Sequence, residues 1–570
     1  MPFLTRMRWS ALVLTLLLQT MCARGNVAPQ IVDVQILAFN DFHGSLEPAV
    51  GTNGLIERNV VGGVEYLATH VARLRATNPN TVVVSAGDNI GATPFLSGMF
   101  HDEPTIEALN EVGLQISTVG NHEFDEGWWE VLRMQRGGCH PVDGCQDDTP
   151  FEGAKFAYLS ANVVVDPARV DQEKLRESGW TPPSPTNTLF PASVVRTVGG
   201  ARIGFIGLVV KTAPEIVQPY ATRGLTFRPE AEAANEEVKR LTAQGVRTIV
   251  VLIHEGATPQ REAYDSCEGV NGPVMEITRA LSAEVDAVVA GHVHRAYNCT
   301  VAGKLVTSAA SLGRIVTDID LRVDLRTGNV VSKSARNTLV TRDVDKATSV
   351  TALVERYRPL AMRVGSRVVG SVAAEIPREQ NKNGEASLGD VVADAFLEAG
   401  REAMPGPAEA ALVNTGSLRA GLVGETGADG TRRVTYAQAF EVLPFGNRVQ
   451  VKTVTGDTII RWLEQQFDNP GPGRATIMQV AGLTYSFSPS RPAGQRVNRT
   501  TLRIGGQPLQ PGRRYRVVSN DFVWNGGDAF SVATEGNDPV DVGADVDVLV
   551  AYLGKHPAVQ PGKLDRLTLE

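Results

Sequence analysis

The sequence predicts an α/β protein built from two domains, and three observations support this fold class. The chain has 570 residues, which is more than one ordinary domain holds and indicates two large ones. Up to residue 342, short apolar runs alternate with segments of helical spacing, the order expected of α/β folds. From Asp345 the composition changes, and turn-rich breaks separate the later elements.

The elements can be justified in chain order from the spacing of apolar residues. Five continuous apolar runs are expected as strands buried on both faces. They cover residues 34–39, 81–86, 201–209, 248–253 and 285–290. Val64, Leu67, Ala68, Val71 and Leu74 have the spacing of one helix face, and a charged segment between Pro229 and Gly245 predicts a second helix.

A linker helix is expected over residues 345–365, between an N-terminal domain (31–342) and a C-terminal domain (366–570). Val350, Val354 and Tyr357 lie on one helical face. Pro359 is expected to interrupt or kink this helix, because proline lacks the backbone N–H that a helix interior uses.

Composition excludes several classes of protein. Apolar residues make up 42% and charged residues 21% of the chain, which excludes wholesale disorder, collagen and a polytopic membrane protein. The net charge is −8, so no basic excess is present to bind the phosphates of DNA or RNA. A nucleic acid is therefore not an expected partner.

The N-terminus has the pattern of an export signal over residues 1–25. Basic residues Arg6 and Arg8 precede the ten-residue stretch Trp9–Leu18, and small Ala23 follows. This stretch is too short for a membrane span, which needs about 20 residues. We expect a secreted or periplasmic protein with no stable membrane span, and a single-span anchor is the alternative.

Cys22 leaves a lipidated cell-surface form as another alternative. Met21, directly before it, is large for a lipidation motif, which favours simple export. An oxidising compartment favours disulfides for the other four cysteines. Cys139 and Cys145 bracket a tight loop and are expected to pair, which leaves Cys267 to pair with Cys299. A zinc site made by these cysteines with His140 is the competing interpretation, but its spacing lacks the usual CxxC pairs.

Side chains able to bind metals follow the apolar runs. The motifs are Asp41-Phe42-His43, Gly87-Asp88, Gly120-Asn121-His122-Glu123-Phe124-Asp125, His254 and Gly291-His292-Val293-His294. Each alone is compatible with an ordinary turn or loop, and the other histidines (His70, His101, His140 and His556) are interpreted as ordinary. Ligands collect at the carboxyl ends of strands in α/β sheets. Nitrogen and oxygen donors without thiolates suit two borderline or hard divalent ions.

These motifs, in this order, resemble the signature of calcineurin-like metallophosphoesterases, and GNHEFD with the second domain resembles the 5′-nucleotidase branch. The resemblance implies a four-layer αββα sandwich followed by a second α/β domain that binds substrate. It implies one metal held by Asp41, His43, Asp88 and His294, and another held by Asp88, Asn121, His254 and His292. It also implies that His122 and Asp125 form the catalytic pair, in which the carboxylate orients the imidazole.

Four segments of the C-terminal domain resemble the nucleotide pocket of this family: residues 387–395, 414–419, 443–447 and 520–528. The resemblance implies that Phe445 and Phe522 stack on the base and that Asp528 binds ribose. It places Asn414 and Arg419 at the phosphate loop, and puts Arg378 and Lys382 where the family often has two arginines. Lysine keeps the charge but lacks the planar fork that grips phosphate. Core packing is the competing interpretation of both phenylalanines.

The predicted function is hydrolysis of 5′-nucleotides to nucleoside and phosphate by two divalent metal ions, zinc, manganese or similar. Two enzymatic alternatives remain: a 2′,3′-cyclic-nucleotide phosphodiesterase with 3′-nucleotidase activity, and a pyrophosphatase of nucleotide-sugars or dinucleotides. A non-catalytic nucleotide-binding surface protein is an alternative of another class, and the intact ligand set argues against it. The expected partner is a small nucleotide, and the sequence predicts no oligomeric state.

Overall fold

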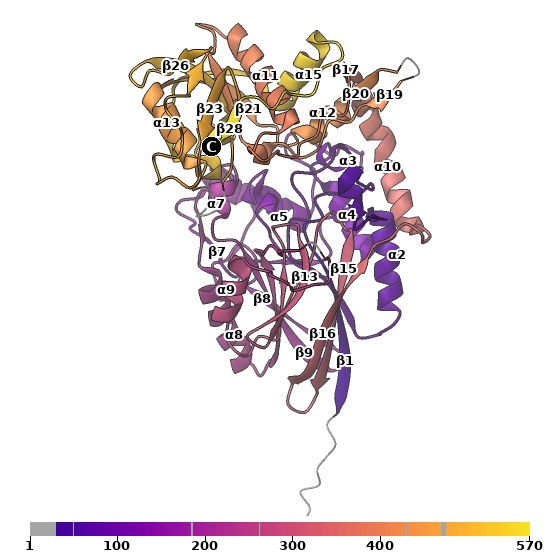
Figure 1. The fold of residues 1–570 in the computed structure, drawn as a ribbon. Helices are drawn as coiled ribbons and strands as arrows, with labels where there is room; N and C mark the ends of the chain where they lie inside the picture. Colours follow the sequence, from indigo (N-terminus) through magenta and orange to yellow (C-terminus); the bar gives the residue numbers. More distant parts are fainter. Residues whose placement is uncertain (1–29, 50, 184–185, 262, 428–429, 469–474) are drawn as a thin grey trace, which may run out of the picture.

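The computed structural model describes residues 30–570 except 50, 184–185, 262, 428–429 and 469–474 (Figure 1). The predicted export signal, with Cys22, lies outside the described residues. None of the described helices combines the length and the apolarity that crossing a membrane requires.

Two six-stranded sheets form the centre of the N-terminal domain. The first has the order β16-β15-β1-β4-β5-β6. Its strands are β1 Ile31–Phe39, β4 Thr81–Ser85, β5 Ile116–Thr118, β6 Ala157–Leu159, β15 Ile315–Asp324 and β16 Asn329–Leu339. The second has the order β13-β14-β12-β11-β9-β8. Its strands are β8 Ser193–Val198, β9 Ala201–Val209, β11 Thr248–His254, β12 Ala287–Ala290, β13 Ala296–Val301 and β14 Lys304–Ala309.

Successive side chains along each central strand point to opposite faces of the sheet, and this arrangement gives four layers. In β1, Ile36 and Ala38 belong to the core between the two sheets, together with residues of β9 and β11. Leu37 and Phe39 instead face helices α2 (Val64–Arg75), α4 (Glu103–Val112) and α5 (Trp128–Arg136). The outer face of the second sheet packs on α8 (Glu230–Ala243) and α9 (Pro273–Ala280). The predicted four-layer αββα fold is confirmed.

Helix α10 (Thr348–Gly365) lies between the two domains, along one side of the molecule (Figure 1). The sequence predicted an interruption or kink at Pro359, but the structure has one continuous helix through this residue, so the interruption is wrong. Pro359 is exposed, whereas Val354, Tyr357 and Ala361 are buried on the opposite face. The carbonyl that loses its helix partner therefore faces water, which replaces the missing hydrogen bond.

The C-terminal domain is built on a mixed five-stranded sheet with the order β22-β18-β26-β21-β27. These strands are β18 Ala410–Val413, β21 Arg448–Thr455, β22 Gln479–Ala481, β26 Arg514–Asn520 and β27 Asn537–Ala544. Helices α11 (Ser387–Glu402), α12 (Tyr436–Val442) and α15 (Asp545–Lys555) share one core with it. Helix α13 (Gly456–Gln465) packs in a second hydrophobic core of the same domain.

Two smaller sheets complete this domain, with the orders β17-β20-β19 and β25-β24-β23-β28. Their strands are β17 Val368–Val372, β19 Glu425–Thr426, β20 Arg432–Thr435, β23 Leu483–Phe487, β24 Arg503–Ile504, β25 Gln507–Pro508 and β28 Leu567–Leu569. A second α/β domain was predicted and is present. The exact residue boundaries of the domains remain a prediction.

An aromatic contact joins the two domains. Phe95 of α3 (Phe95–Gly98) meets Tyr436 and Phe440 of α12 edge-to-face, at centroid distances of 5.8 and 5.3 Å. On the same boundary, the side chain of Gln218 donates a hydrogen bond of 2.9 Å to Asn447. The C-terminal domain is therefore packed directly over the N-terminal domain.

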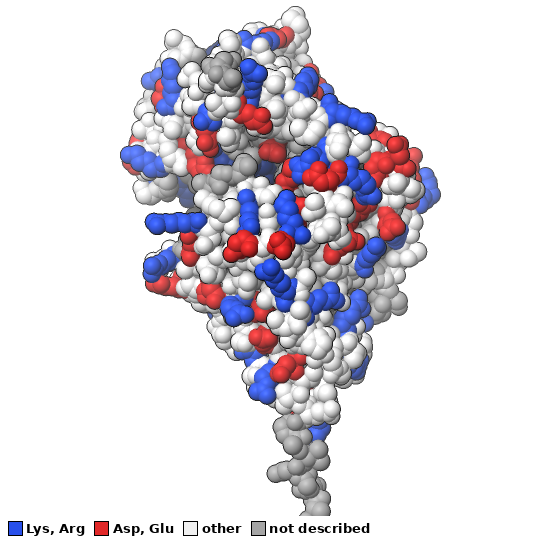
Figure 2. All heavy atoms as spheres, turned by 90° about the vertical axis from the view of Figure 1, so that its right-hand side faces the viewer, with Lys and Arg blue, Asp and Glu red and all other residues white. Residues whose placement is uncertain are grey.

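The structure joins Cys139 to Cys145 and Cys267 to Cys299, which is the pairing that the sequence predicts. All four thiols are used in these bonds, so none is left for the competing zinc site. Figure 2 shows acidic and basic side chains intermixed over one face of the molecule, in keeping with the small net charge.

Candidate active site between the two domains

The seven predicted metal ligands meet at one edge of the paired sheets. Asp41 and His43 follow β1, Asp88 follows β4, and Asn121 follows β5. His254 ends β11, and His292 and His294 follow β12. Because parallel strands end at the same edge, chain order alone brings these side chains together.

Backbone strain is concentrated at these ligands. Five of them have positive φ, between 46° and 73°: Asp41, His43, Asp88, His292 and His294. Residues with a Cβ rarely adopt this conformation, and it tends to persist where the surrounding structure and the function require it. The loops are therefore shaped around the position of these side chains.

Asp41, His43 and His294 form the first group that could hold a cation. Nδ1 of His43 donates to the carbonyl oxygen of Gly91 at 2.8 Å, which leaves the lone pair on Nε2. That nitrogen lies 3.1 Å from Nε2 of His294, which in turn lies 3.2 Å from Oδ1 of Asp41. Burial holds the pKa of His43 well below its usual range although Asp88 opposes the shift, so the ring is neutral, the form that binds metals.

Asp88, His254 and His292 form the second group. Nδ1 of His254 donates to the carbonyl oxygen of Ala86 at 2.8 Å, so Nε2 is the ring nitrogen turned toward Asp88. This nitrogen lies 3.0 Å from Oδ2 of Asp88 without being aligned for a hydrogen bond. The side-chain oxygen of Asn121 is buried and has no hydrogen-bond partner among the described residues.

Asp88 stands between the two groups, because the same Oδ2 lies 3.6 Å from Nε2 of His43. Ring nitrogens and carboxylate oxygens that converge, and backbone carbonyls that hold the outer ring nitrogens, are features of metal sites. The donor set therefore fits two divalent cations with Asp88 shared.

Glu123 is a site residue for which sequence reasoning assigned no role. It is buried, and its two carboxylate oxygens accept hydrogen bonds from the backbone N–H groups of Asp88, Asn89 and Gly120 at 2.5–2.9 Å. Burial, reinforced by Asp88, raises its pKa to about 7. The signal was present in GNHEFD, but only the structure shows that this carboxylate positions two ligand loops.

His122 and Asp125 are paired as the resemblance implied. Nδ1 of His122 donates to Oδ2 of Asp125 at 2.8 Å, and its backbone N–H donates to Oδ1 of Asp88 at 2.9 Å. Burial lowers the pKa of His122, but the carboxylates of Asp125 and Asp88 outweigh burial and raise it. The imidazole lies beside the first group, 5.1 Å from the ring of His43.

A cavity of about 1510 Å³ opens over these residues and continues between the domains. His43, Asp88, Asn121, His122 and His294 line its N-terminal wall, whereas Asp41 and His254 are buried behind it. The C-terminal wall includes Arg378, Asn414, Arg419, Phe445, Phe522 and Asp528. One cavity thus contains both halves of the predicted site.

Arg419 and Arg378 give the C-terminal wall its positive charge. No carboxylate of the described residues forms an ion pair with Arg419, and burial together with Arg378 lowers its pKa. Arg378 donates to the carbonyl oxygen of Leu418 at 3.1 Å, so the two guanidinium groups are held beside the same loop. Such a pair favours an anionic group between the domains.

Lys382, predicted to accompany Arg378, is not among the residues that line the cavity; it is exposed. It lies at the tip of a turn closed by a bridge between Gln380 and Ala386. The side chain of Asn381 accepts hydrogen bonds from the backbone of Asn383 and Glu385, which shapes this turn. The turn carries the ammonium group into solvent.

The two phenylalanines line the cavity in different ways. Phe445 stacks on His122 with ring centroids 5.8 Å apart, and the Arg419 guanidinium lies 5.7 Å from its ring. Phe522 is only 8% exposed and belongs to the core of its domain, packed against the backbone of Gly527. Phe522 therefore combines the predicted location with the competing core role.

Asp528 is held in place by Asn414. The amide of Asn414 donates to Oδ2 of Asp528 at 2.7 Å, and its oxygen accepts from Ser417 and Asn520. Asp528 has φ of 52°, in the left-handed region. This network presents a carboxylate to the cavity in a fixed direction.

Comparison with known proteins now decides the family. Residues 34–296 match the family model described as calcineurin-like phosphoesterase, and residues 368–535 match the 5′-nucleotidase C-terminal domain. The chain belongs to the calcineurin-like phosphoesterases that carry a 5′-nucleotidase C-terminal domain. Members of the calcineurin-like group are hydrolases that use divalent metals.

Alignments with known proteins cover most of the chain. Cell wall protein Lmo0130 of Listeria monocytogenes is 30% identical over 92% of this chain and 67% of its own length. Endonuclease YhcR of Bacillus subtilis is 28% identical over 92% of this chain, which spans only 40% of that protein. The crystal structure of the 5′-nucleotidase precursor from Thermus thermophilus has a TM-score of 0.76 and 26% identity, covering 94% of this chain and 99% of that one.

Proposed function

We propose that the protein is an exported phosphohydrolase that cleaves 5′-nucleotides to a nucleoside and inorganic phosphate. One observation carries the proposal: a single cavity has the metal-ligand groups and the His122–Asp125 pair on one wall. Its opposite wall has Arg419, Asp528 and Phe445. The first wall suits a phosphate ester and the second suits a nucleotide.

The two ligand groups would hold two divalent cations, zinc, manganese or similar. Asp41, His43 and His294 would hold one cation, and Asn121, His254 and His292 the other. Asp88 would be shared by both. When bound, two such cations supply Lewis acidity and an activated water for phosphate ester hydrolysis. Glu123 keeps the Asp88 and Asn121 loops in register through their backbone N–H groups.

His122 would act on the phosphoryl group. Its Nδ1–H is held by Asp125, so the ring orientation is set and Nε2 remains for the substrate. With its pKa raised by the two carboxylates, the ring can carry a proton on Nε2 toward a phosphoryl or leaving-group oxygen. Such a donor stabilises negative charge as it develops in the transition state.

The C-terminal wall would hold the rest of the substrate. Arg419, supported by Arg378, pairs with phosphate, and Asp528 accepts hydrogen bonds from ribose hydroxyls. Phe445 stacks on the base, and Phe522 lines the same cavity. A ring accepts any base on its face, so this wall places little restriction on base identity.

Export is supported by the N-terminal signal pattern and by two disulfides, which form in oxidising compartments. One relative is named as a cell wall protein. Signal cleavage is checked by N-terminal sequencing of the protein secreted by a host that expresses the full chain.

A substrate panel tests the activity. Product formation is followed by chromatography, together with phosphate release, for 5′-, 3′- and 2′,3′-cyclic nucleotides, UDP-glucose and a single-stranded oligonucleotide, with added Zn²⁺ or Mn²⁺. We expect the 5′-mononucleotides to give the highest kcat/KM, and chelation or Asp88→Asn to abolish it. A preference for the cyclic or diphosphate substrates, or hydrolysis that survives complete metal removal, would overturn the proposal.

A further inference from the structure

A second group of histidines and carboxylates lies in the N-terminal domain, outside the residues that line the cavity. His101, Glu126 and His140 each offer one ligand atom, and these atoms all lie within 4.8 Å of one another. His101 follows α3, Glu126 follows the short 3-10 helix η2 (His122–Phe124), and His140 lies after α5. Three separate segments of the chain thus converge.

The two imidazole rings are arranged in parallel. Their centroids are 3.6 Å apart and their planes differ by 13°. Nδ1 of His101 lies 2.8 Å from Oε2 of Glu126. The histidine side chains are only 18% and 13% exposed, whereas Glu126 is 47% exposed. The group is therefore partly desolvated and open to solvent on the side of the carboxylate.

Asp143 serves as a common partner on the other edge of the rings. Its Oδ2 lies 2.8 Å from Nε2 of His101, and its backbone N–H donates to Nδ1 of His140 at 3.2 Å. Metal-binding histidines usually donate their second ring N–H to a carboxylate, which fixes the tautomer and leaves the other nitrogen for the metal. His101 meets this description, with Nε2 toward Asp143 and Nδ1 toward Glu126.

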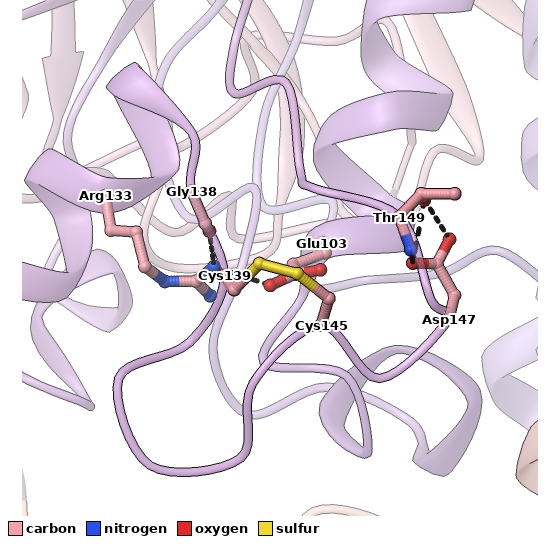
Figure 3. The surroundings of a disulfide bond; sticks show 7 residues. All are labelled: Glu103, Arg133, Gly138, Cys139, Cys145, Asp147 and Thr149. Atoms are coloured by element: carbon pink, nitrogen blue, oxygen red, sulfur yellow. Dashed lines mark hydrogen bonds and ion pairs between the residues drawn. A yellow bond between two sulfur atoms is a disulfide. The ribbon is translucent and has the colours of Figure 1, made fainter.

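The loop that carries His140 and Asp143 is closed at both ends. The disulfide Cys139–Cys145 brackets it, and Arg133 of α5 donates to the carbonyl oxygen of Gly138 at 2.7 Å (Figure 3). The same arginine pairs with Glu103 of α4 at 2.5 Å. Because the loop is tied to two helices, His140 and Asp143 need little rearrangement to meet a ligand.

We propose that His101, Glu126 and His140 form an additional divalent-cation site, suited to Zn²⁺ or a similar transition metal, with Asp143 as the residue that positions the rings. Two imidazoles and a carboxylate are a donor set that zinc accepts while leaving a fourth position open. Imidazole ligands disfavour Ca²⁺ and Mg²⁺, which prefer oxygen. A cation here would tie together the segments that follow α3, η2 and α5.

The alternative to a bound metal ion is a protonated histidine. A protonated His101 can hold Glu126 and Asp143 by two charge-assisted hydrogen bonds and needs no metal. The two states differ in what happens to added zinc, so metal content rather than activity separates them.

The test compares the full-length protein with His140→Ala. Both are dialysed against a series of buffered free Zn²⁺ concentrations, and bound zinc per chain is measured by elemental analysis. We expect the variant to bind one zinc ion fewer per chain. Zinc should also raise the melting temperature less in the variant, because a ligand that binds only the folded state stabilises it.

Three further variants distinguish loss of the zinc site from poor folding and provide a control. Glu126→Gln removes a ligand charge at an exposed position and should also lose the ion, even if His140→Ala folds poorly. Asp143→Asn should keep the site but weaken its zinc affinity by about 10- to 100-fold, as outer partners of metal ligands do. His556→Ala, which breaks an ordinary pair with Glu398, is the matched control and should bind as much zinc as the parent. Equal zinc in the parent, His140→Ala and Glu126→Gln would overturn the proposal.

Discussion

His122 is held by two hydrogen bonds that leave Nε2 free of the described residues. The ring bonds Asp125, and the backbone N–H bonds Asp88, a predicted metal ligand. The residue is thus fixed relative to the metal groups without belonging to them. This separation makes its contribution measurable apart from metal binding.

We expect His122→Ala to lower kcat by about 10²- to 10⁴-fold, the range for a positioned proton donor, while bound metal stays at the parent level. Steady-state kinetics and elemental analysis on the same sample check this. His70→Ala is the matched control, because His70 bonds only Thr341 among the described residues of the same domain. Loss of metal in His122→Ala in proportion to the loss of activity would contradict the role.

Phe445 is the better of the two phenylalanines for testing base recognition, because Phe522 is mostly core. Stacking contributes about 1–3 kcal/mol per base, so Phe445→Ala should weaken nucleotide binding by roughly 5- to 150-fold. Turnover of an aryl phosphate, which has no base, should change far less. If kcat/KM for both substrates falls equally, Phe445 acts through its contact with His122 instead.

At the scale of elements, the disulfides differ in how much chain they restrain. Cys267–Cys299 joins residues 32 positions apart and connects the segment after β11 to β13, whereas Cys139–Cys145 spans six positions. A longer closed loop loses more conformational freedom in the unfolded chain. The first bond therefore has the larger expected effect on stability.

We expect the double substitution Cys267→Ser with Cys299→Ser to lower the free energy of unfolding by about 3–4 kcal/mol, and the pair Cys139→Ser with Cys145→Ser to lower it by about 2 kcal/mol. Urea denaturation followed by tryptophan fluorescence measures both. The opposite ranking would show that strain or residual structure, rather than loop length, decides the stabilisation.

At the scale of the whole molecule, the contact between domains contains two facing carboxylates. Glu441 of α12 and Glu47 of the N-terminal domain both line the cavity, and Glu47 also pairs with Arg358. Burial, reinforced by Glu47, raises the pKa of Glu441 to about 7. The packed arrangement therefore favours the protonated form of Glu441.

Because packing raises this pKa, the contribution of Glu441 to domain closure is fully present below its ordinary pKa of 4.5 and is lost as the pH rises through about 7. Small-angle scattering should show a larger radius of gyration above this pH, and Glu441→Gln should remove that part of the change. Glu111→Gln, which changes an exposed carboxylate on α4, is the control. Identical pH curves for the parent and Glu441→Gln would refute the effect.

The sequence alone predicted the features that depend on local order. The strands end in Asp, Asn and His residues, and parallel strands end at one edge. The resemblance of these motifs to a known family then assigned the ligands without coordinates. The His122–Asp125 pair is three residues apart, and the cysteine pairing followed from loop length and elimination. In each case neighbours in space are set by spacing along the chain or by the order of strands.

Tertiary structure alone decided the features that depend on packing between distant segments. It moved Lys382 out of the cavity, placed Phe522 largely in a core, and gave Glu123 its role in holding two loops. It kept α10 continuous through Pro359, since that residue faces water. It also brought His101 and His140 into contact, although both had looked ordinary in the sequence. These outcomes depend on contacts between side chains that are far apart in the sequence. A local pattern of residues does not specify such contacts.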